Sequence, residues 1–372
     1  MKVLAFVPHN MDTTPAQRLR IEQWSRYWRQ EGIQTTFVPF SSPRLRQTMY
    51  AYRRYGPKLV GVLEALLRYG RRVRSLDLGA FDVAFVAREA TLVGPPFVER
   101  YITRRGLKFL YDFDDAIFLA YPSQKSPLFT VGRWYSKISE ICRLSSHITV
   151  VNQYLRRYAT QHHQNITVVP MGMAVDKIPR SMLHRHHENP IVSIGWTGSF
   201  STSAYVEQIF PVLKEIQQDT GCALHLMGTQ PDLSHPGLAL NLHRWSPQTE
   251  DSVIAGFDIG INPMPIDDWS KGKGTGKTLQ YMCYGVPVVA TPVGSNIEII
   301  RHGENGLFAT SNEEWLDALR RLISDHGLRQ SMGMNARATI EQSYDIRDHS
   351  RQVAQLMQNI ANTMSKDMPC VE

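Results

Sequence analysis

The chain has 372 residues, a length that predicts two or three domains of about 150 residues each. Its 42% hydrophobic and 10% aromatic content is enough for full cores, and the absence of any run of 18 apolar residues excludes a transmembrane helix. Met1–Pro8 reads as a strand, interrupted too early by Pro8 for a signal peptide. Four widely spaced cysteines predict reduced thiols, no zinc site and a cytoplasmic location.

Short apolar strands alternate with longer amphipathic segments along the chain. This alternation predicts βαβ units and doubly wound parallel sheets, an α/β fold. Strands are expected at 2–7, 34–38, 82–87, 107–111, 147–151, 166–169, 191–195, 222–227, 257–262, 286–290 and 306–308. Helices are expected between the strands, for example at 15–31, 127–145, 201–219, 247–255, 275–284 and 312–325, with two more around Tyr344 and Asp345 in the tail.

Two arginines, Arg18 and Arg20, stand near the start of the helix expected after the first strand. The guanidinium fork matches phosphate and carboxylate groups, so both are candidates for binding an anionic substrate. Arginines on an exposed helix face are the alternative. Arg88 and Glu89, just past the strand at 82–87, are weaker candidates of the same kind.

Residues 41–76 carry nine lysines and arginines against one glutamate, a net charge of +8 in a chain whose total is +7. Tyrosines and leucines interleave with these charges, so a basic amphipathic helix is expected. Such a helix suits an anionic membrane surface. The alternative is a solvated helix whose apolar side packs on the sheet. Nucleic acid is not expected as a partner, because nothing else in the chain resembles a nucleic-acid-binding module.

Three carboxylates, Asp112, Asp114 and Asp115, follow the end of the strand expected at 107–111. Ligands of open α/β sheets bind beyond the carboxyl ends of the strands. Carboxylates this close raise one another's pKa, which is tolerated more readily in a catalytic site than elsewhere. A D-x-D metal site and a helix N-cap by Asp114 or Asp115 are alternatives. The run also resembles the nucleophile motif of haloacid-dehalogenase-like phosphatases.

The densest motif begins with a loop rich in glycine and lysine at 271–276. It leads into the helix at 275–284, which Gly285 is expected to end in the left-handed conformation, and then into an apolar strand. A helix N-terminus presents unpaired N–H groups and partial positive charge, so a phosphate or diphosphate site is predicted here. Its candidate residues are Thr275, Gly276, Lys277 and Thr278. A Walker A motif is the alternative, but it needs glycine where the chain has Lys271.

This stretch resembles the signature of retaining GT-B glycosyltransferases of family 4, the glycosyl transferases group 1. In that signature a lysine, a helix and the sequence G-x-P-V-V-A precede a glycine and a glutamate. The corresponding residues are Lys277, Gly285–Ala290, Gly294 and Glu298. The run from Tyr111 to Asp115 is similar to a Y-D-x-D-D run in a subgroup of these enzymes.

The resemblance implies two Rossmann-like domains facing a cleft. The acceptor-binding domain is expected at 1–176, a linker at 177–190, the nucleotide-sugar-binding domain at 191–343, and a helix crossing back to the first domain at 344–372. The family usually carries two glutamates where this chain has Gly272 and Gln280, and Gln280 can still bond a ribose hydroxyl. The other donor-binding candidates are Gly198, Ser199, Glu298 and Trp245, with the N–H groups of Gly198 and Ser199 facing the phosphates.

The resemblance implies a glycosyltransferase that moves a sugar from a nucleotide-sugar to a glycan, lipid-linked or small-molecule acceptor. Retention of configuration, no metal and no cofactor are expected, with Asp112, Asp114, Asp115, Arg18 and Arg20 as catalytic candidates. We expect a cytoplasmic protein, with a peripheral position on the inner face of the cell membrane through 41–76. The alternatives are a catalytically silent nucleotide-sugar-binding protein and a phosphatase that uses Asp112 or Asp114.

Overall fold

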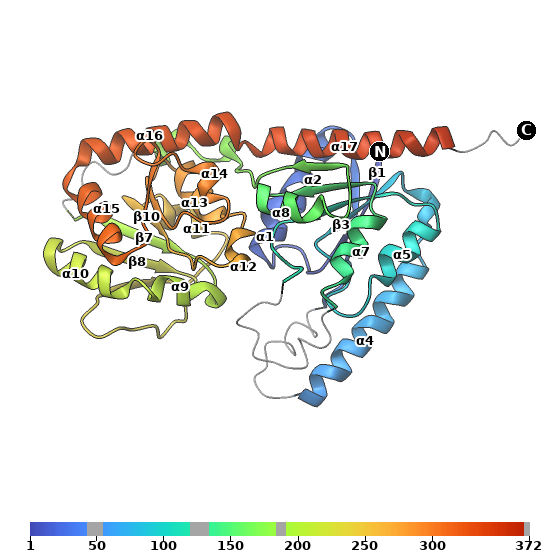
Figure 1. Cartoon of the computed structure of the whole chain (residues 1–372), viewed down its shortest axis with the longest axis horizontal. Coiled ribbons are helices and arrows are strands. Elements are labelled where there is room, and N and C mark those ends of the chain that lie inside the picture. The colour runs from blue at the N-terminus through green and yellow to red at the C-terminus, as the bar shows by residue number, and fades with distance from the viewer. Residues whose placement is uncertain (43–54, 120–133, 184–190, 368–372) are drawn as a thin grey trace, which may run out of the picture. The chain divides into compact units, whose positions relative to one another are not determined.

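The structure, a computed structural model, describes residues 1–42, 55–119, 134–183 and 191–367 (Figure 1). The chain divides into two compact units. Unit 1 comprises Met1–Pro170 together with Arg347–Glu372, and unit 2 comprises Met171–Ile346. Each unit is a parallel sheet of six strands with helices on its faces, so the predicted α/β class with two Rossmann-like sheets is confirmed.

The sheet of unit 1 has the strand order β2-β1-β3-β4-β5-β6. Its strands are β1 (Lys2–Val7), β2 (Gln34–Pro39), β3 (Val83–Ala87), β4 (Phe109–Phe113), β5 (His147–Val150) and β6 (Ile166–Val168). The middle strands β3 and β4 are buried along their whole length, as required of strands covered on both faces. The order reverses between β1 and β3, and ligands of such sheets bind at this switch, beyond the carboxyl ends of the strands.

The helices of unit 1 are α1 (Pro15–Gln17), a π-helical turn (Arg18–Glu22), α2 (Gln23–Gln30), α4 (Tyr55–Arg74), α5 (Phe97–Arg104), α7 (Lys137–Leu144), α8 (Gln153–Ala159) and α17 (Ile346–Asp367). Two tryptophans of α2 join α17 to this unit. Trp24 and Trp28 are fully buried and pack on Phe85 of β3. Trp28 Nε1 donates to the carbonyl oxygen of Ser350 at 2.8 Å. The end of the chain therefore belongs to the core of unit 1.

The sheet of unit 2 has the order β12-β11-β10-β7-β8-β9, with the switch between β7 and β10. Its strands are β7 (Ser193–Thr197), β8 (Ala223–Met227), β9 (Leu240–His243), β10 (Ile259–Asn262), β11 (Val288–Ala290) and β12 (Gly306–Phe308). Its helices are α9 (Ser203–Glu207), α10 (Phe210–Thr220), α11 (Glu250–Ile254), α12 (Asp268–Lys271), α13 (Gly276–Cys283), α14 (Asn296–Ile299), α15 (Asn312–Ser324) and α16 (His326–Ser343). Gly285 follows α13 with a φ of +75°, so its predicted left-handed conformation is confirmed.

Two expectations about elements need correction. The strand β9 was not predicted, because it is a short, half-exposed edge strand that alternates with polar residues. The helices α5 and α8 lie between predicted strands, where helices were expected without stated bounds. The single helix expected at 201–219 is interrupted, and α10 begins anew with Pro211 in its first turn. Proline lacks the N–H that would continue the preceding helix.

The stretch predicted as a linker, 177–190, is only partly described. Residues 171–183 group with unit 2, while 184–190, whose sequence includes His184, His186 and His187, lie outside the described residues. Backbone hydrogen bonds explain the grouping. Met173 N donates to Tyr344 O at 2.8 Å, and Ile346 N donates to Met173 O at 3.0 Å. The chain thus enters and leaves unit 2 through adjacent backbone segments.

Candidate functional site

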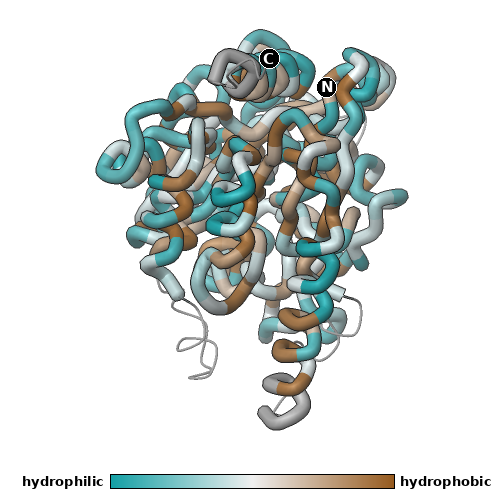
Figure 2. The backbone as a smooth tube through the Cα atoms, turned by 90° about the vertical axis from the view of Figure 1, so that its right-hand side faces the viewer, coloured by the Kyte–Doolittle hydropathy of each residue, from teal (hydrophilic) through white to brown (hydrophobic). Residues whose placement is uncertain are grey.

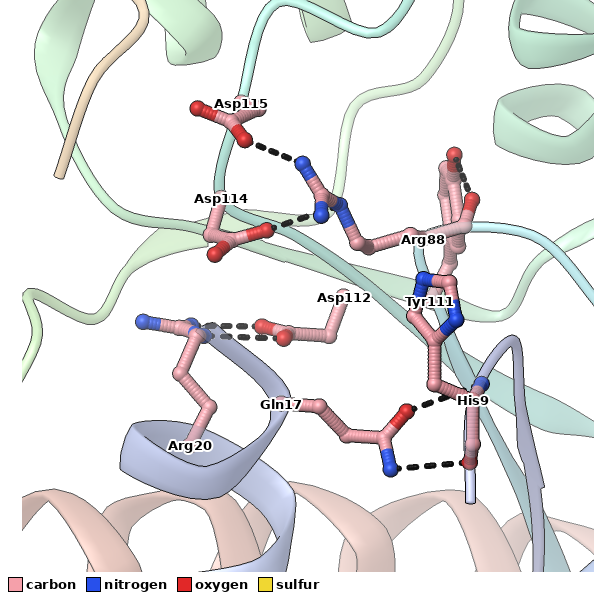
Figure 3. Close-up of polar contacts among 8 residues, drawn as sticks. All are labelled: His9, Gln17, Arg20, Arg88, Tyr111, Asp112, Asp114 and Asp115. Atoms are coloured by element: carbon pink, nitrogen blue, oxygen red, sulfur yellow. Dashed lines mark hydrogen bonds and ion pairs between the residues drawn. The ribbon is translucent and has the colours of Figure 1, made fainter. Parts of the chain in front are cut away.

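The acidic run of unit 1 lies at the carboxyl edge of the sheet, next to the switch between β1 and β3. Asp112 is part of β4 and is in register with Ala87 of β3 and Thr149 of β5. Asp114 and Asp115 follow the strand. Figure 3 shows two arginines approaching these carboxylates, Arg20 from the helical segment after β1 and Arg88 from the end of β3. Each arginine neutralises a different part of the run.

Arg20 and Asp112 form a buried, bidentate ion pair. Arg20 Nε donates to Asp112 Oδ2 at 2.9 Å, and Nη2 donates to Oδ1 at 2.5 Å. Thr149 Oγ1 also donates to Oδ1, at 2.7 Å. Arg20 Nη1 donates to Val169 O at 2.9 Å, and the guanidinium carbon lies 4.5 Å from the centroid of the Trp24 ring. The side chains of Arg20 and Asp112 are only 2% and 4% exposed.

This pair corrects the expectation of an arginine fork that is open to a substrate or lies on an exposed helix face. Arg20 sits in the π-helical turn with non-helical backbone angles, φ −118° and ψ −107°, and its side chain reaches inward to β4. Arg18 is half-buried and takes no part in this ion pair. Both carboxylate oxygens of Asp112 accept hydrogen bonds within the protein. Its role in this geometry is to hold the end of β4 against the segment after β1.

Arg88 joins the other two carboxylates. Its Nε lies 3.1 Å from Asp114 Oδ1, and its Nη2 contacts Asp115 Oδ2. The φ of Arg88 is +59°, a conformation that costs free energy for any residue except glycine. Two backbone contacts hold it there: Arg88 N donates to Asp112 O at 2.6 Å, and Tyr111 Oη donates to Arg88 O at 2.7 Å. Asp114 and Asp115 therefore bind an arginine instead of capping the next turn.

Burial raises the pKa of Asp114 above its ordinary value, and the nearby charge of Arg88 lowers it only in part. A buried carboxylate with a raised pKa beside a strained arginine is the combination that marks functional sites in proteins. Asp115, whose side chain is 13% exposed, is the more accessible of the two. Repulsion from Asp115, the cause expected from the sequence, contributes less to the raised pKa of Asp114 than burial does.

A pocket opens beside this network at the switch between β1 and β3. Its lining includes His9, Thr14, Gln17, Arg20, Arg88, Asp112 and Asp114. Gln17 binds both backbone groups of His9: His9 N donates to Oε1 at 3.2 Å, and Nε2 donates to His9 O at 3.0 Å (Figure 3). The hydroxyl of Thr14 is buried and has no hydrogen-bond partner in the described part of the chain. His9, Thr14 and Gln17 were not predicted as site residues, although their place directly after the first strand pointed to this edge.

In unit 2 the central residue is Lys277, the second residue of α13. Its ammonium nitrogen lies 4.3 Å from the centroid of the fully buried Trp196 ring and 3.4 Å from Thr202 Oγ1. No carboxylate of the described residues forms an ion pair with it. Burial, together with the nearby Lys273, lowers the pKa of Lys277 to about 7. A lysine held in this way is stabilised by an anionic ligand.

The residues around Lys277 divide between ligand-facing and structural positions. Thr275 precedes the helix with a φ of +47°, and its buried hydroxyl has no partner in the described chain. Gly276 is the first helical residue. Thr278 is fully buried: it donates to Asn296 Oδ1 at 2.7 Å and accepts from Asn262 Nδ2 at 2.9 Å. Its hydroxyl is therefore engaged inside the unit, because one residue turns the helix by about 100° from Lys277, whereas the role of its backbone N–H at the helix start stays a prediction.

The turn after β7 also differs from expectation. Gly198 N donates to Met227 O at 2.9 Å, which continues the sheet ladder, and Ser199 N donates to Thr202 Oγ1 at 3.2 Å as part of a capping box. Both N–H groups are therefore occupied and do not face a phosphate. Gly198 still has a steric role, since a Cβ there would lie 2.2 Å from the Trp196 ring. The turn positions the tryptophan that underlies Lys277.

A third cluster in unit 2 joins Trp245, Gln280 and Glu250. Trp245 Nε1 donates to Glu250 Oε1 at 3.1 Å, and Gln280 Nε2 donates to the same oxygen at 3.0 Å. Glu250 is buried at the start of α11 and was not predicted, because no spacing along the chain connects it to residue 280. Glu298 is exposed on α14.

Among the described residues, no three histidine, cysteine, aspartate or glutamate side chains gather in a way that could hold a metal ion. No helix in that part of the chain is both long and apolar enough to cross a membrane. Cys142, Cys222 and Cys283 are free and buried.

Solved structures share this architecture across nearly the whole chain. Sucrose-phosphate synthase from Thermosynechococcus elongatus superimposes with a TM-score of 0.70 at 12% identity, covering 98% of this chain and all of that one. Anabaena HepE in complex with UDP gives 0.65 at 15% identity, covering 96% and 100%. The lipopolysaccharide outer core galactosyltransferase WaaB gives 0.63 at 12% identity, covering 98% and 100%. These likenesses establish the fold, which is GT-B.

Residues 192–325 match the family model described as Glycosyl transferases group 1. The matched segment, 134 of the 372 residues, is similar to the glycosyl transferases group 1, and the fold of the whole chain is GT-B. The match covers the strands and helices that carry Lys277, Trp245, Glu250 and Glu298, whereas the acidic run lies outside it. Membership of the subgroup with a Y-D-x-D-D run stays a prediction. No curated protein matches the sequence.

Proposed function

We propose that this protein is a glycosyltransferase that moves a sugar from a nucleoside-diphosphate sugar to an acceptor, with retention of configuration and without a metal ion. The observation that carries the proposal is Lys277, a half-buried cation at the start of α13 with no acidic partner among the described residues. Sugar transfer leaves a nucleoside diphosphate, whose charge grows in the transition state. Fixed positive groups aimed at that charge accelerate the reaction.

The Trp245, Glu250 and Gln280 cluster supports the placement of the nucleoside. Gln280, one member of this cluster, belongs to α13 and lies about one helical turn beyond Lys277. An indole face and polar oxygens suit a base and a ribose, respectively. The solved HepE structures contain UDP and UDP-glucose, which is in keeping with this class of donor.

We propose that the pocket beside Arg88, Asp114 and Asp115 takes part in binding the substrates and that the acceptor is a glycan or a lipid-linked molecule. Asp114 and Asp115 are the reactive carboxylates in this proposal, while Arg20 and Asp112 hold the strand end in place. The basis is the strained φ of Arg88 and the raised pKa of Asp114. No phosphatase role is proposed, since both oxygens of Asp112 are engaged.

A ligand panel tests the proposed activity. Nucleoside diphosphates and nucleotide-sugars are added while the thermal midpoint is recorded, because a ligand at 100 times its Kd adds about 2.7 kcal/mol of stability. Release of nucleoside diphosphate from each stabilising nucleotide-sugar is then measured with acceptor mixtures. Stabilisation without release under any condition would indicate a catalytically silent binding protein instead.

Diphosphate binding is expected to depend on pH around Lys277. The free lysine has its pKa lowered to about 7, and the bound anion favours the charged form, so binding above pH 7 takes up a proton. Affinity should fall as pH rises from 7 to 9, by up to about tenfold per unit. Titration calorimetry at pH 8 in two buffers with different ionisation heats measures the uptake. A Lys277→Met variant should show none, and equal uptake in both proteins would refute the assignment.

The pH dependence that Lys277 gives to the stability of the ligand-free protein has the opposite sign from that of ligand binding. Its pKa is lower in the folded state than in the unfolded state, so the unfolded chain binds more protons between pH 7 and about 10.4. This residue therefore makes the free protein less stable as pH falls through that window.

Turnover is expected to survive metal chelation. The positive charge for the leaving diphosphate is supplied by Lys277 and the start of α13, so no divalent cation is needed in this scheme. The measurement is the initial rate of nucleoside diphosphate release before and after dialysis against EDTA. A collapse that magnesium restores would make the acidic run a metal site and would overturn this part of the proposal.

We further propose that α4 places the enzyme on an anionic membrane surface at the inner face of the cell membrane. One face of α4, at Ala65, Tyr69 and Val73, is buried against unit 1. The opposite face exposes Val60 (65%), Leu63 (52%) and Leu67 (65%). Figure 2 shows the alternation of apolar and polar residues along this helix, which reaches the bottom of the view. The alternative hypothesis, a solvated helix whose single apolar side packs on the sheet, does not account for this second, exposed apolar stripe.

Arginines flank the exposed stripe. Arg71 and Arg74 are exposed near the C-terminal end of α4, and at 100° per residue Arg74 falls between Leu63 and Leu67 around the helix. An apolar stripe bordered by guanidinium groups is the pattern of helices that lie in a lipid interface. Residues 43–54 of the basic segment lie outside the described residues.

Vesicle co-sedimentation tests this proposal. The wild-type protein should sediment with anionic vesicles at low salt but not with neutral ones, and added salt should release it. A Leu63→Gln/Leu67→Gln variant and an Arg71→Gln/Arg74→Gln variant should each bind several-fold less, since a basic residue at such a surface contributes about 1 kcal/mol. Met334→Gln, which changes an exposed methionine on α16 of unit 2, is the control. Unchanged sedimentation of both α4 variants would assign the stripe to another partner.

A further inference from the structure

A second pocket in unit 1 lies between the carboxyl end of β2 and the helix α4. A cavity of about 190 Å³ that opens to solvent is bordered by Asn10, Phe40, Ser41, Arg68, Tyr69 and Arg72. None of the residues that line the first pocket, beside Arg88, contributes to it. It is also distinct from the outward stripe of α4, because Arg68 and Arg72 lie on the side of the helix next to its buried face.

Contacts between α4 and β2 fix the shape of this pocket. Tyr69 Oη donates to Val38 O at 3.3 Å, and its ring meets Phe40 edge-on with 5.3 Å between the centroids. Arg72 Nη2 donates to Phe37 O at 3.5 Å, which tethers one guanidinium to the sheet edge. Phe40 N and Ser41 N continue the ladder to Val7 O and Pro8 O, at 2.9 and 3.1 Å. The pocket is therefore formed by backbone and side chains of α4 and of the segment at the end of β2, which hydrogen bonds hold together.

The pocket carries a net positive charge. Two of the residues that line it are arginines, and none of the described residues in the lining is acidic. Two acidic side chains act on residues of the lining: Glu64 Oε1 lies 3.5 Å from Arg68 Nη2, with both side chains at least half exposed, and Glu99 interacts electrostatically with Tyr69. The solvent-screened pair of Glu64 and Arg68 contributes little and does not cancel the charge of the pocket. Serine hydroxyls add neutral donors at its rim.

We propose that this pocket binds a phosphate monoester. Two guanidinium forks one helical turn apart match the several oxygens and the double charge of a monoester, whereas a single carboxylate needs only one fork. The hydroxyl of Ser41 lies among the lining residues and can donate to a remaining oxygen, whereas the Tyr69 hydroxyl is already bound to Val38 O. The monoester is either the headgroup of a lipid or part of a soluble phosphorylated molecule. Its role as an acceptor rests on the proposed transfer function, but the binding site does not.

The test uses the full-length chain carrying Lys277→Ala, so that phosphate binding at the proposed donor site is removed. Inorganic phosphate is titrated in a calorimeter against this protein and against versions that also carry Arg68→Gln/Arg72→Gln or Arg71→Gln/Arg74→Gln. The pocket change should weaken phosphate binding by tenfold or more, because hydrogen bonds to charged groups are among the stronger ones in proteins. The matched change on the outward face should leave it unaltered. Equal losses in both, or none in the first, would overturn the proposal.

The same proteins distinguish the two sources of the phosphate. They are sedimented with phosphatidylcholine vesicles that contain either phosphatidic acid, a monoester, or the same fraction of phosphatidylglycerol, a diester. Preference for phosphatidic acid that disappears with Arg68→Gln/Arg72→Gln supports a lipid headgroup. Phosphate binding without that preference supports a soluble ligand. If the double variant unfolds at a lower urea concentration, Arg68→Gln alone replaces it, since Arg68 makes no described bond to the sheet.

Discussion

Lys277→Ala is expected to weaken binding of a nucleoside diphosphate by about 10- to 150-fold while changing binding of the bare nucleoside by less than about twofold. This range corresponds to the roughly 1.5–3 kcal/mol of a hydrogen bond to a charged group. The lysine approaches the ligand from the start of α13, on the buried ring of Trp196. Titration calorimetry with both ligands at pH 7 measures the difference.

Lys271→Ala is the matched control for this change. Lys271 belongs to the same loop, but its ammonium is exposed and forms an ion pair with Asp268 at 2.8 Å. It should leave diphosphate affinity within about twofold. Equal losses for diphosphate and nucleoside in Lys277→Ala would show that the lysine supports the unit generally and does not contact the phosphates. A large loss in Lys271→Ala would move the site to the exposed part of the loop.

Asp112→Asn is expected to destabilise unit 1 by about 3–5 kcal/mol, because it leaves the charge of Arg20 buried without its counter-ion. Arg20 is 2% exposed and bonds to both carboxylate oxygens, so solvent does not replace the lost charge, and Asp114, which also interacts with Arg20, is already paired with Arg88. Urea unfolding followed by tryptophan fluorescence reports on this unit, since Trp24 and Trp28 are in its core. The first transition should move to lower urea.

Asp12→Asn provides the comparison, because Asp12 pairs with Arg26 at 3.7 Å and both side chains are more than half exposed. Its effect should stay below about 1 kcal/mol. A combined Arg20→Met/Asp112→Leu protein should recover much of the stability lost in Asp112→Asn, since removing both charges removes the desolvation cost. If Asp112→Asn unfolds like the wild type, the pair contributes nothing to the fold and the carboxylate becomes a stronger candidate for chemistry.

The two arginines of unit 1 change how the acidic run is interpreted. Three neighbouring carboxylates suggested repulsion and shared protons, a feature of metal and nucleophile sites. The structure divides the run: Asp112 belongs to Arg20 inside the sheet edge, and Asp114 with Asp115 belongs to Arg88 at the pocket. Only the second group combines burial, a raised pKa and a strained neighbour. In unit 1, Asp114 and Asp115 beside Arg88 are therefore better candidates for a catalytic role than Asp112.

Local sequence patterns were sufficient to predict the architecture and the candidate diphosphate-binding site at Lys277. Apolar strands alternating with amphipathic helices are a local pattern, because burial of the middle strands of a parallel sheet needs continuous runs such as Val83–Ala87. The left-handed Gly285 and the lysine at the start of α13 are local too, since a helix terminus is defined by the residues next to it. These predictions needed no knowledge of distant contacts.

The hydrogen-bond and ion-pair partners of the candidate site residues depend on tertiary contacts. Arg20 meets Asp112 across 92 positions, and Gln280 meets Glu250 across 30, so no spacing in the chain connects them. We predicted that the N–H groups of Gly198 and Ser199 bind a phosphate, because a turn before a helix leaves donors free. In the structure these N–H groups donate instead to the neighbouring strand β8 and to the capping residue Thr202. The physical reason is the same throughout. A buried polar group must find a partner wherever the fold provides one, and the strand order, not the sequence separation, sets which groups come within 3 Å.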